Sequence, residues 1–179
     1  HYLDVMCQIT QSKPLSVSAI GVRLSDEIPK DNYNYGQLQI RFEDDSVGWY
    51  EAGWGPMISE TAFFVKDVIG PNGSVSIVSD DDTFNKDSDN IENHTKNNCL
   101  KIHSSKLDSD DNFISPNKKI VYNEDPSHQD LCDYEQEYFY KSISENIDLK
   151  SHMEDAYKRL QIALACDEAV RKGKTVFLD

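Results

Sequence analysis

Residues 35–54 carry the pattern that most limits what this chain can fold into. Within 35–44 (YGQLQIRFED) apolar and polar side chains alternate, the apolar ones being Leu38, Ile40 and Phe42 and the polar ones Gln37, Gln39 and Arg41. Because successive side chains of an extended strand point to opposite faces, this alternation predicts an antiparallel strand that is buried on one side. The turn residues at 44–46 (DDS) and the run at 47–54 (VGWYEAGW) predict that the chain returns as a second strand.

Further strands are predicted where β-branched and aromatic residues cluster between turn signals. They cover 14–24, 62–70, 74–78, 99–105, 120–123 and 175–178. The segment 71–74 (PNGS) joins two of them, and Gly73 supplies the positive φ that a tight turn of this kind requires. These short, closely spaced strands favour a mostly antiparallel open sheet.

The apolar period becomes helical after Pro126. Ser127 is a candidate N-cap of a first helix, and the Asp130 carboxylate suits that end because a helix N-terminus carries partial positive charge. The residues expected along one apolar side of this helix are Leu131, Tyr134, Tyr138 and Ile143.

A second helix is predicted between 148 and 173. Ser151 and Glu154 have the spacing of a capping box at its start, and Gly173 occupies the position of a C-terminal cap. Strands followed by a pair of helices predict an α+β fold in which the helices pack on one face of the sheet. The length fits one domain, 1–179.

The charge of the chain excludes two classes of partner. Its 32 acidic residues outnumber 18 basic ones, for a net charge of −14. Nucleic acids and anionic membranes are bound by clustered Lys and Arg, so we expect no nucleic-acid partner and no membrane partner. No apolar stretch approaches the ~20 residues that cross a membrane. The four cysteines (Cys7, Cys99, Cys132 and Cys166) form no CxxC motif, which predicts reduced thiols in a cytoplasmic protein.

Two acidic segments, 79–98 and 107–119, contain few apolar residues and are predicted to be surface loops. Both place Asp and Asn at the first positions of a calcium-binding loop. Position 12 of these two frames is Lys96 and Lys119, where a bidentate glutamate is required. Four histidines (His94, His103, His128 and His152) include no pair at the i, i+4 spacing of a helical zinc site. We therefore expect no metal ligands.

Trp49 and Trp54 flank a glycine-containing stretch of the second predicted strand. Five residues apart, they would point to opposite faces of a regular strand. One interpretation is a core tryptophan and a half-exposed one; the other is an aromatic wall for a sugar-like ligand or a partner subunit. A sheet face that still carries aromatic residues after the helices cover the other face predicts a homo-oligomer that assembles through the open face.

The chain begins HYLDVMCQIT, inside a pattern of helical period and without a preceding cap residue. His1 and Asp4 are three residues apart, so they would share one face of that helix. From the residues alone, His1 is a surface or core histidine, and Asp4 is a carboxylate near the positive end of a helix.

Four segments, in this order, resemble the Gfo/Idh/MocA family of oxidoreductases, the relatives of glucose–fructose oxidoreductase and inositol dehydrogenase. HYLDVM (1–6) resembles the end of the family's D-x-x-x-H-x-x-D stretch, and YGQLQIRFEDDSVGWYEAGWGP (35–56) resembles the paired strands that follow. DVIGPNGSVSI (67–77) resembles the next hairpin. HMEDAYKRLQIALACDEAVRKGKTVFL (152–178) is similar to the family's closing helix and final strand.

The resemblance implies a parent enzyme of two domains, of which this chain is the C-terminal substrate-binding and oligomerisation domain. The N-terminal Rossmann domain, which holds NAD or NADP, is expected to precede His1, because the chain has no glycine fingerprint and no Glu-Lys-Pro motif. Without it the chain is expected to bind no cofactor. By the resemblance His1 matches the catalytic histidine and Asp4 the carboxylate after it. Asp4 and Trp54 are the candidate substrate-binding residues.

The expected function is therefore that of a domain from an NAD(P)-dependent oxidoreductase that acts on a small-molecule substrate, namely a sugar, polyol or related hydroxylated metabolite. The domain alone would be inactive. Imidazole suits the removal of a hydroxyl proton because its pKa lies near neutrality. Two alternatives stay open at this point: a non-catalytic dimerising interaction module, and a small-molecule binding protein that uses the tryptophan strand.

Overall fold

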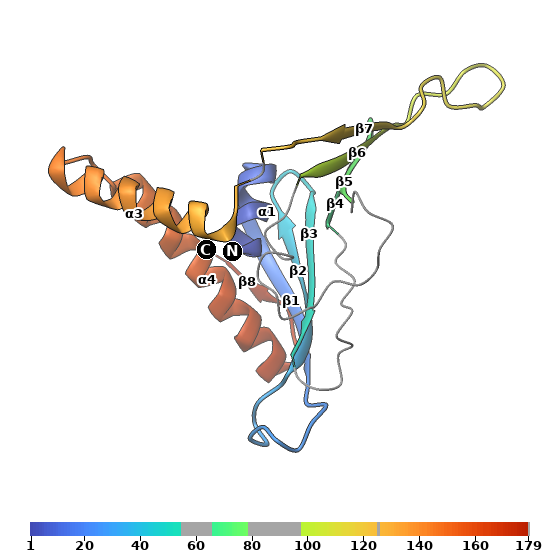
Figure 1. The fold of residues 1–179 in the computed structure, drawn as a ribbon. Helices are drawn as coiled ribbons and strands as arrows, with labels where there is room; N and C mark the ends of the chain where they lie inside the picture. Colours follow the sequence, from blue (N-terminus) through green and yellow to red (C-terminus); the bar gives the residue numbers. More distant parts are fainter. Residues whose placement is uncertain (55–65, 79–97, 125, 179) are drawn as a thin grey trace. The chain divides into compact units, whose positions relative to one another are not determined.

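The computed structural model describes residues 1–54, 66–78, 98–124 and 126–178 (Figure 1). The chain divides into two units. The first unit is discontinuous in sequence and consists of His1–Ile58 and Glu145–Asp179, while the second consists of Ser59–Ser144. Most of the acidic segment predicted at 79–98 lies outside the described residues.

The first unit contains an antiparallel sheet with the strand order β3-β2-β1-β8. Its strands are β1 (Pro14–Val22), β2 (Tyr35–Phe42), β3 (Val47–Gly53) and β8 (Val176–Phe177). The predicted hairpin is confirmed, with Ile40 opposite Gly48 across β2 and β3. Its turn forms because the Asp44 carboxylate accepts hydrogen bonds from both the backbone N–H and the hydroxyl of Ser46.

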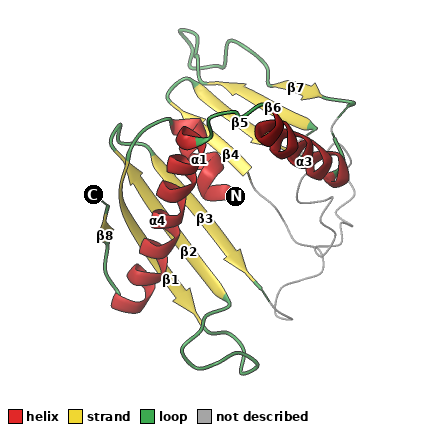
Figure 2. Cartoon of the chain, turned by 90° about the vertical axis from the view of Figure 1, so that its left-hand side faces the viewer, coloured by secondary structure: helices red, strands yellow, loops and turns green. Residues whose placement is uncertain are grey.

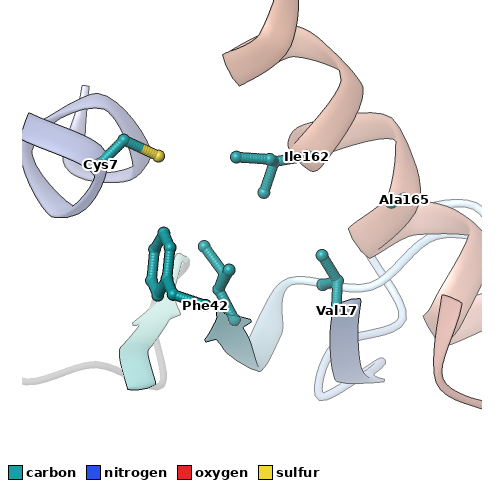
Figure 3. Close-up of a cluster of buried hydrophobic side chains, with 6 residues drawn as sticks. Cys7, Val17, Phe42, Ile162 and Ala165 are labelled. Carbon is teal, nitrogen blue, oxygen red and sulfur yellow. The ribbon is translucent and has the colours of Figure 1, made fainter. Parts of the chain in front are cut away.

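Two helices, α1 (Tyr2–Thr10) and α4 (Lys150–Lys172), pack with this sheet. Figure 2 shows α4 lying across one face of the strands. The buried side chains at this contact are Cys7, Val17, Ile40, Phe42, Ile162 and Ala165. In Figure 3 the Ile162 side chain points from α4 into the space between α1 and the strands. The predicted alternation is confirmed, because Ile40 and Phe42 are fully buried whereas Gln39 and Arg41 are exposed.

The two ends of α4 differ in how well the sequence predicted them. Gly173 is in the left-handed conformation (φ 60°) and its N–H donates to the Ala169 carbonyl, as a C-terminal cap should. The prediction that Ser151 begins a capping box is wrong, because the helix already begins at Lys150. The Asp148 carboxylate accepts the Lys150 N–H at 2.9 Å, so it satisfies an N-terminal donor before Ser151 is reached.

The second unit contains another antiparallel sheet, in the order β4-β5-β6-β7. Its strands are β4 (Lys66–Gly70), β5 (Gly73–Ile77), β6 (Cys99–Ser104) and β7 (Lys118–Val121). Gly73 has a φ of 140°, in agreement with the predicted turn. The strand predicted at 120–123 begins earlier, at Lys118. In the preceding segment the Asp108 carboxylate accepts the N–H groups of Asp110 and Asn112, which lowers the pKa of Asp108.

The fold class is confirmed as α+β, but the described strands form two four-stranded sheets where we expected one. The division falls between the end of β3 at Gly53 and the start of β4 at Lys66. The first part of the strand predicted at 62–70 lies outside the described residues.

Helix α3 (His128–Ser144) belongs to the second unit. Its predicted cap is confirmed: the Asp130 carboxylate accepts the N–H and the hydroxyl of Ser127, and the Asp130 N–H donates back to the Ser127 hydroxyl. The side of α3 that was predicted to be apolar is not buried in the structure. Its residues are 40% to 66% exposed, namely Leu131, Tyr134, Tyr138 and Ile143. Tyrosine tolerates such exposure because its hydroxyl can stay in water. No described helix is long and apolar enough to cross a membrane.

Candidate functional site

The helix that begins after His1 is held tightly against the sheet of the first unit. The Tyr2 ring stacks on Tyr50 of β3, with ring centroids 5.1 Å apart and an angle of 28° between the planes. One turn later Met6 lies over Gly48, where an added Cβ would come within 2.8 Å of the Met6 sulfur. A glycine at position 48 therefore lets α1 approach β3 this closely.

An ion pair joins α1 to α4 on the same side of the unit. Arg159 Nε donates to Asp4 Oδ1 at 3.2 Å, and the second oxygen of Asp4 accepts a hydrogen bond from Gln8 at 2.7 Å. The Arg159 side chain is only 19% exposed, whereas Asp4 is 46% exposed. Both carboxylate oxygens of Asp4 thus accept hydrogen bonds from protein side chains. In this structure Asp4 helps to hold α1 against α4.

His1 occupies the N-cap position of α1. Its carbonyl accepts the first helical hydrogen bond, from the N–H of Val5 at 3.0 Å, while its side chain makes no cap hydrogen bond and is exposed. The backbone of His1 is therefore fixed by the helix, and its imidazole is accessible from solvent. His1 and Asp4 lie in the same first turn, as the sequence indicated.

Tyr50 is a residue of this region that sequence reasoning did not select as a site residue. Burial, with a smaller contribution from the neighbouring Tyr2, raises the pKa of its hydroxyl above the ordinary value. Tyr50 is therefore a neutral phenol near pH 7 and can donate a hydrogen bond to an oxygen-rich ligand. Arg159 was also missed. No local signal in either segment shows that Arg159 and Tyr50 meet the first turn of α1.

The structure places the third predicted site residue elsewhere. Trp54 follows the end of β3, is 76% exposed, and donates its backbone N–H to the Asn34 carbonyl at 2.7 Å. It lies four residues beyond Tyr50, which is about 13 Å along an extended chain. The structure thus brings Asp4 together with Arg159 and Tyr2 together with Tyr50, in the turn that follows His1. The contacts of Trp54 lie elsewhere.

Trp49 lies on the opposite, open face of the sheet, where it is paired with Gln39. A shallow hollow of about 270 Å³ opens there, lined by side chains that include Trp49, Gln37, Gln39, Ser18 and Thr175. The hydroxyl groups of Ser18 and Thr175 are hydrogen-bonded to each other across β1 and the C-terminal segment at 2.8 Å. This surface is therefore both aromatic and polar.

The ion pair between Asp4 and Arg159 yields a prediction about stability. Because Asp4 is half exposed, replacing it with asparagine should lower the free energy of unfolding by about 0.2–1 kcal/mol. Arg159→Met should cost a similar amount, and the two effects should not add in the double variant because each change removes the same pair. Urea denaturation of the four proteins measures this. Fully additive losses would show that the two side chains do not interact in solution.

No family model matches the chain, and no curated protein matches it in sequence. Solved structures do match. Aldose–aldose oxidoreductase from Caulobacter crescentus aligns with 99% of this chain at a TM-score of 0.66 and 17% identity. Levoglucosan dehydrogenase in complex with NADH and levoglucosan aligns with 97% at a TM-score of 0.66 and 15% identity. The WlbA dehydrogenase from Bordetella pertussis, in complex with NADH and UDP-GlcNAcA, aligns with 100% at 0.58 and 14%.

The chain shares the fold of part of these oxidoreductases. The similarity that the sequence predicted is thereby confirmed at the level of structure. The matches cover 45%, 47% and 44% of those three proteins, so the chain spans less than half of their length. This share is what a single domain of such an oxidoreductase would cover, as expected for the C-terminal domain.

Proposed function

We propose that this chain is the C-terminal substrate-binding and oligomerisation domain of an NAD- or NADP-dependent oxidoreductase that acts on a sugar, polyol or related hydroxylated metabolite. The observation that carries the proposal is the match over the whole chain to the fold of oxidoreductases, two of which were solved with NADH and a sugar or sugar-nucleotide ligand. The exposed imidazole of His1 at a rigidly held helix terminus supports it.

The proposed role of His1 is that of a general base. Its imidazole would accept the proton of the substrate hydroxyl that becomes a carbonyl, the task for which enzymes most often use a histidine. The Tyr2–Tyr50 stack and the Asp4–Arg159 pair hold the helix, so the imidazole starts from a fixed backbone position. Tyr50 is the candidate donor to another hydroxyl of the substrate.

The described residues do not fit a nicotinamide cofactor by themselves. They contain no glycine-rich phosphate loop, which is the feature that holds the pyrophosphate in dinucleotide-binding domains. We therefore assign cofactor binding to another domain of the proposed enzyme, and this chain supplies the groups that face the substrate.

The proposed function is tested on the full-length protein that contains this chain. It is assayed with NAD⁺ and with NADP⁺ against a panel of aldoses, polyols, inositols and sugar nucleotides, following the absorbance of the reduced cofactor. Oxidation of at least one compound supports the proposal, and a folded, cofactor-binding protein that oxidises none of them contradicts it. In parallel, calorimetric titration of the isolated chain with NADH and NADPH should show no binding. Micromolar affinity would overturn the assignment of the cofactor to another domain.

We also propose that the open face of the first sheet joins two copies of the chain. Its residues include the exposed apolar side chains Ile20, Val47, Trp49 and Phe177, which are 52% to 79% exposed. Apolar groups gathered on one face of a protein are a common feature of interfaces, and a twofold pair is the simplest way to cover them. The net charge of −14 opposes association, so the contact should strengthen at high salt.

Light scattering tests the proposed interface. At roughly 100 μM the mass should exceed that of the 20.4 kDa chain and approach twice that value, more completely at high salt. Trp49→Lys should shift the equilibrium towards the monomer because it places a charge in an apolar contact. Trp54→Lys is the matched control and should leave the mass unchanged, since Trp54 follows the strand. A monomeric chain at both salt levels would contradict the proposal.

A further inference from the structure

One histidine–cysteine pair lies outside the candidate site of the first unit. At the start of α3, Cys132 Sγ lies 3.6 Å from His128 Nε2. The two residues are one helical turn apart, and both are partly buried, whereas most of α3 is exposed. A thiolate sulfur and a neutral imidazole nitrogen are the two ligand types that Zn²⁺ uses most in proteins.

The distance between the two atoms fits a tetrahedral metal ion. Zinc binds sulfur at about 2.3 Å and imidazole nitrogen at about 2.0–2.1 Å, so ligand atoms 3.6 Å apart subtend an angle of about 110° at the metal. This is the tetrahedral value. The same separation also suits a hydrogen bond between thiol and imidazole, in which one proton occupies the place that the metal would take.

The first turn of α3 keeps the pair in position. Ser127 and Asp130 form the reciprocal cap described above, which fixes the backbone of His128 between them. The sequence around the pair is also strongly acidic, with Asp130, Asp133, Glu135 and Glu137 following within three turns. Negative charge of this density attracts divalent cations before any specific bond forms.

We propose that His128 and Cys132 form a two-ligand site for a soft divalent cation of the zinc type. Binding forms one sulfur–metal and one nitrogen–metal bond and releases the thiol proton to the solvent. Among the described residues no set of three His, Cys, Asp or Glu side chains is placed to hold one ion, so two coordination positions are left for water or an added ligand.

The experiment titrates the purified, reduced chain with Co²⁺, a spectroscopic substitute for Zn²⁺. We expect a saturable sulfur-to-cobalt charge-transfer band in the near ultraviolet, together with the intense visible bands of a tetrahedral ion. Zn²⁺ should remove both by displacing the cobalt. The Cys132→Ser variant should lose the charge-transfer band, and His128→Gln should weaken Co²⁺ binding at least tenfold.

His152→Gln is the matched control, because this exposed histidine lies at the start of α4 without a cysteine one turn away. It should bind Co²⁺ like the unaltered chain. Circular dichroism verifies that each variant is folded, and His128→Gln tests the site even if the serine variant fails to fold. The absence of a charge-transfer band at millimolar Co²⁺ would overturn the proposal, and so would a band that keeps its full strength in either of the two variants.

Discussion

Replacing His1 with alanine in the full-length enzyme that we propose is expected to lower kcat by about 10²–10⁴-fold, the usual contribution of a general base. The free energy of unfolding should change by less than about 0.5 kcal/mol, because the side chain is exposed and makes no cap hydrogen bond. Steady-state kinetics on the best substrate, together with urea denaturation, measure the two quantities.

The contrast between these two effects separates a catalytic role for His1 from a structural one. His152→Ala, which removes another exposed histidine from the same unit, serves as the control and should retain full activity. If the His1→Ala enzyme kept more than half of its turnover, the imidazole would not be the base. A large loss of stability at position 1 would instead show that the histidine supports the fold.

The second large effect is expected in the core of the first unit. Phe42→Ala should lower the free energy of unfolding of that unit by about 3–5 kcal/mol, the usual cost of truncating a buried aromatic side chain. Phe42 is the largest fully buried side chain, and it packs against residues from α1 and α4. The cavity left by the ring would therefore weaken the contacts of three elements at once.

Urea denaturation followed by fluorescence of Trp49 and Trp54 reports on the first unit, which contains both. The neighbouring Arg41→Ala is the matched control, since this side chain is 66% exposed and pairs with Asp45 at the surface. Its removal should cost less than about 1 kcal/mol. A loss of less than 1 kcal/mol for Phe42→Ala would mean that the face of β2 identified as core is not buried in solution.

The elements that the sequence predicted well are those fixed by neighbouring residues. The hairpin of β2 and β3 follows from a period-two pattern and from Asp44 in its turn, and the caps at Ser127 and Gly173 depend on the residues next to them. The pairing of β1 with β8 depends on strands that lie far apart in the sequence, which no local pattern reports. The predicted start of α4 is wrong because the acceptor for its first N–H groups is Asp148, which precedes the predicted capping box of Ser151 and Glu154.

The candidate site shows the same limit. The spacing of His1 and Asp4 correctly placed both in one helical turn. The partners of this turn were not predictable, because Tyr50, which stacks on Tyr2, and Arg159, which pairs with Asp4, come from a strand and a helix far along the chain. The His128–Cys132 pair did have a signal, namely a histidine and a cysteine four residues apart.

The discontinuity of the first unit has a consequence for how the chain folds. Phe42 and Ile162 meet in one core although about 120 residues separate them, and closing so long a loop is slow compared with forming local structure. During synthesis the second unit, which is continuous in sequence, is complete before α4 has been made. The part of the apolar sheet face that α4 covers therefore stays exposed until α4 has been made. Over that interval the nascent protein exposes a surface that chaperones bind and that aggregation exploits.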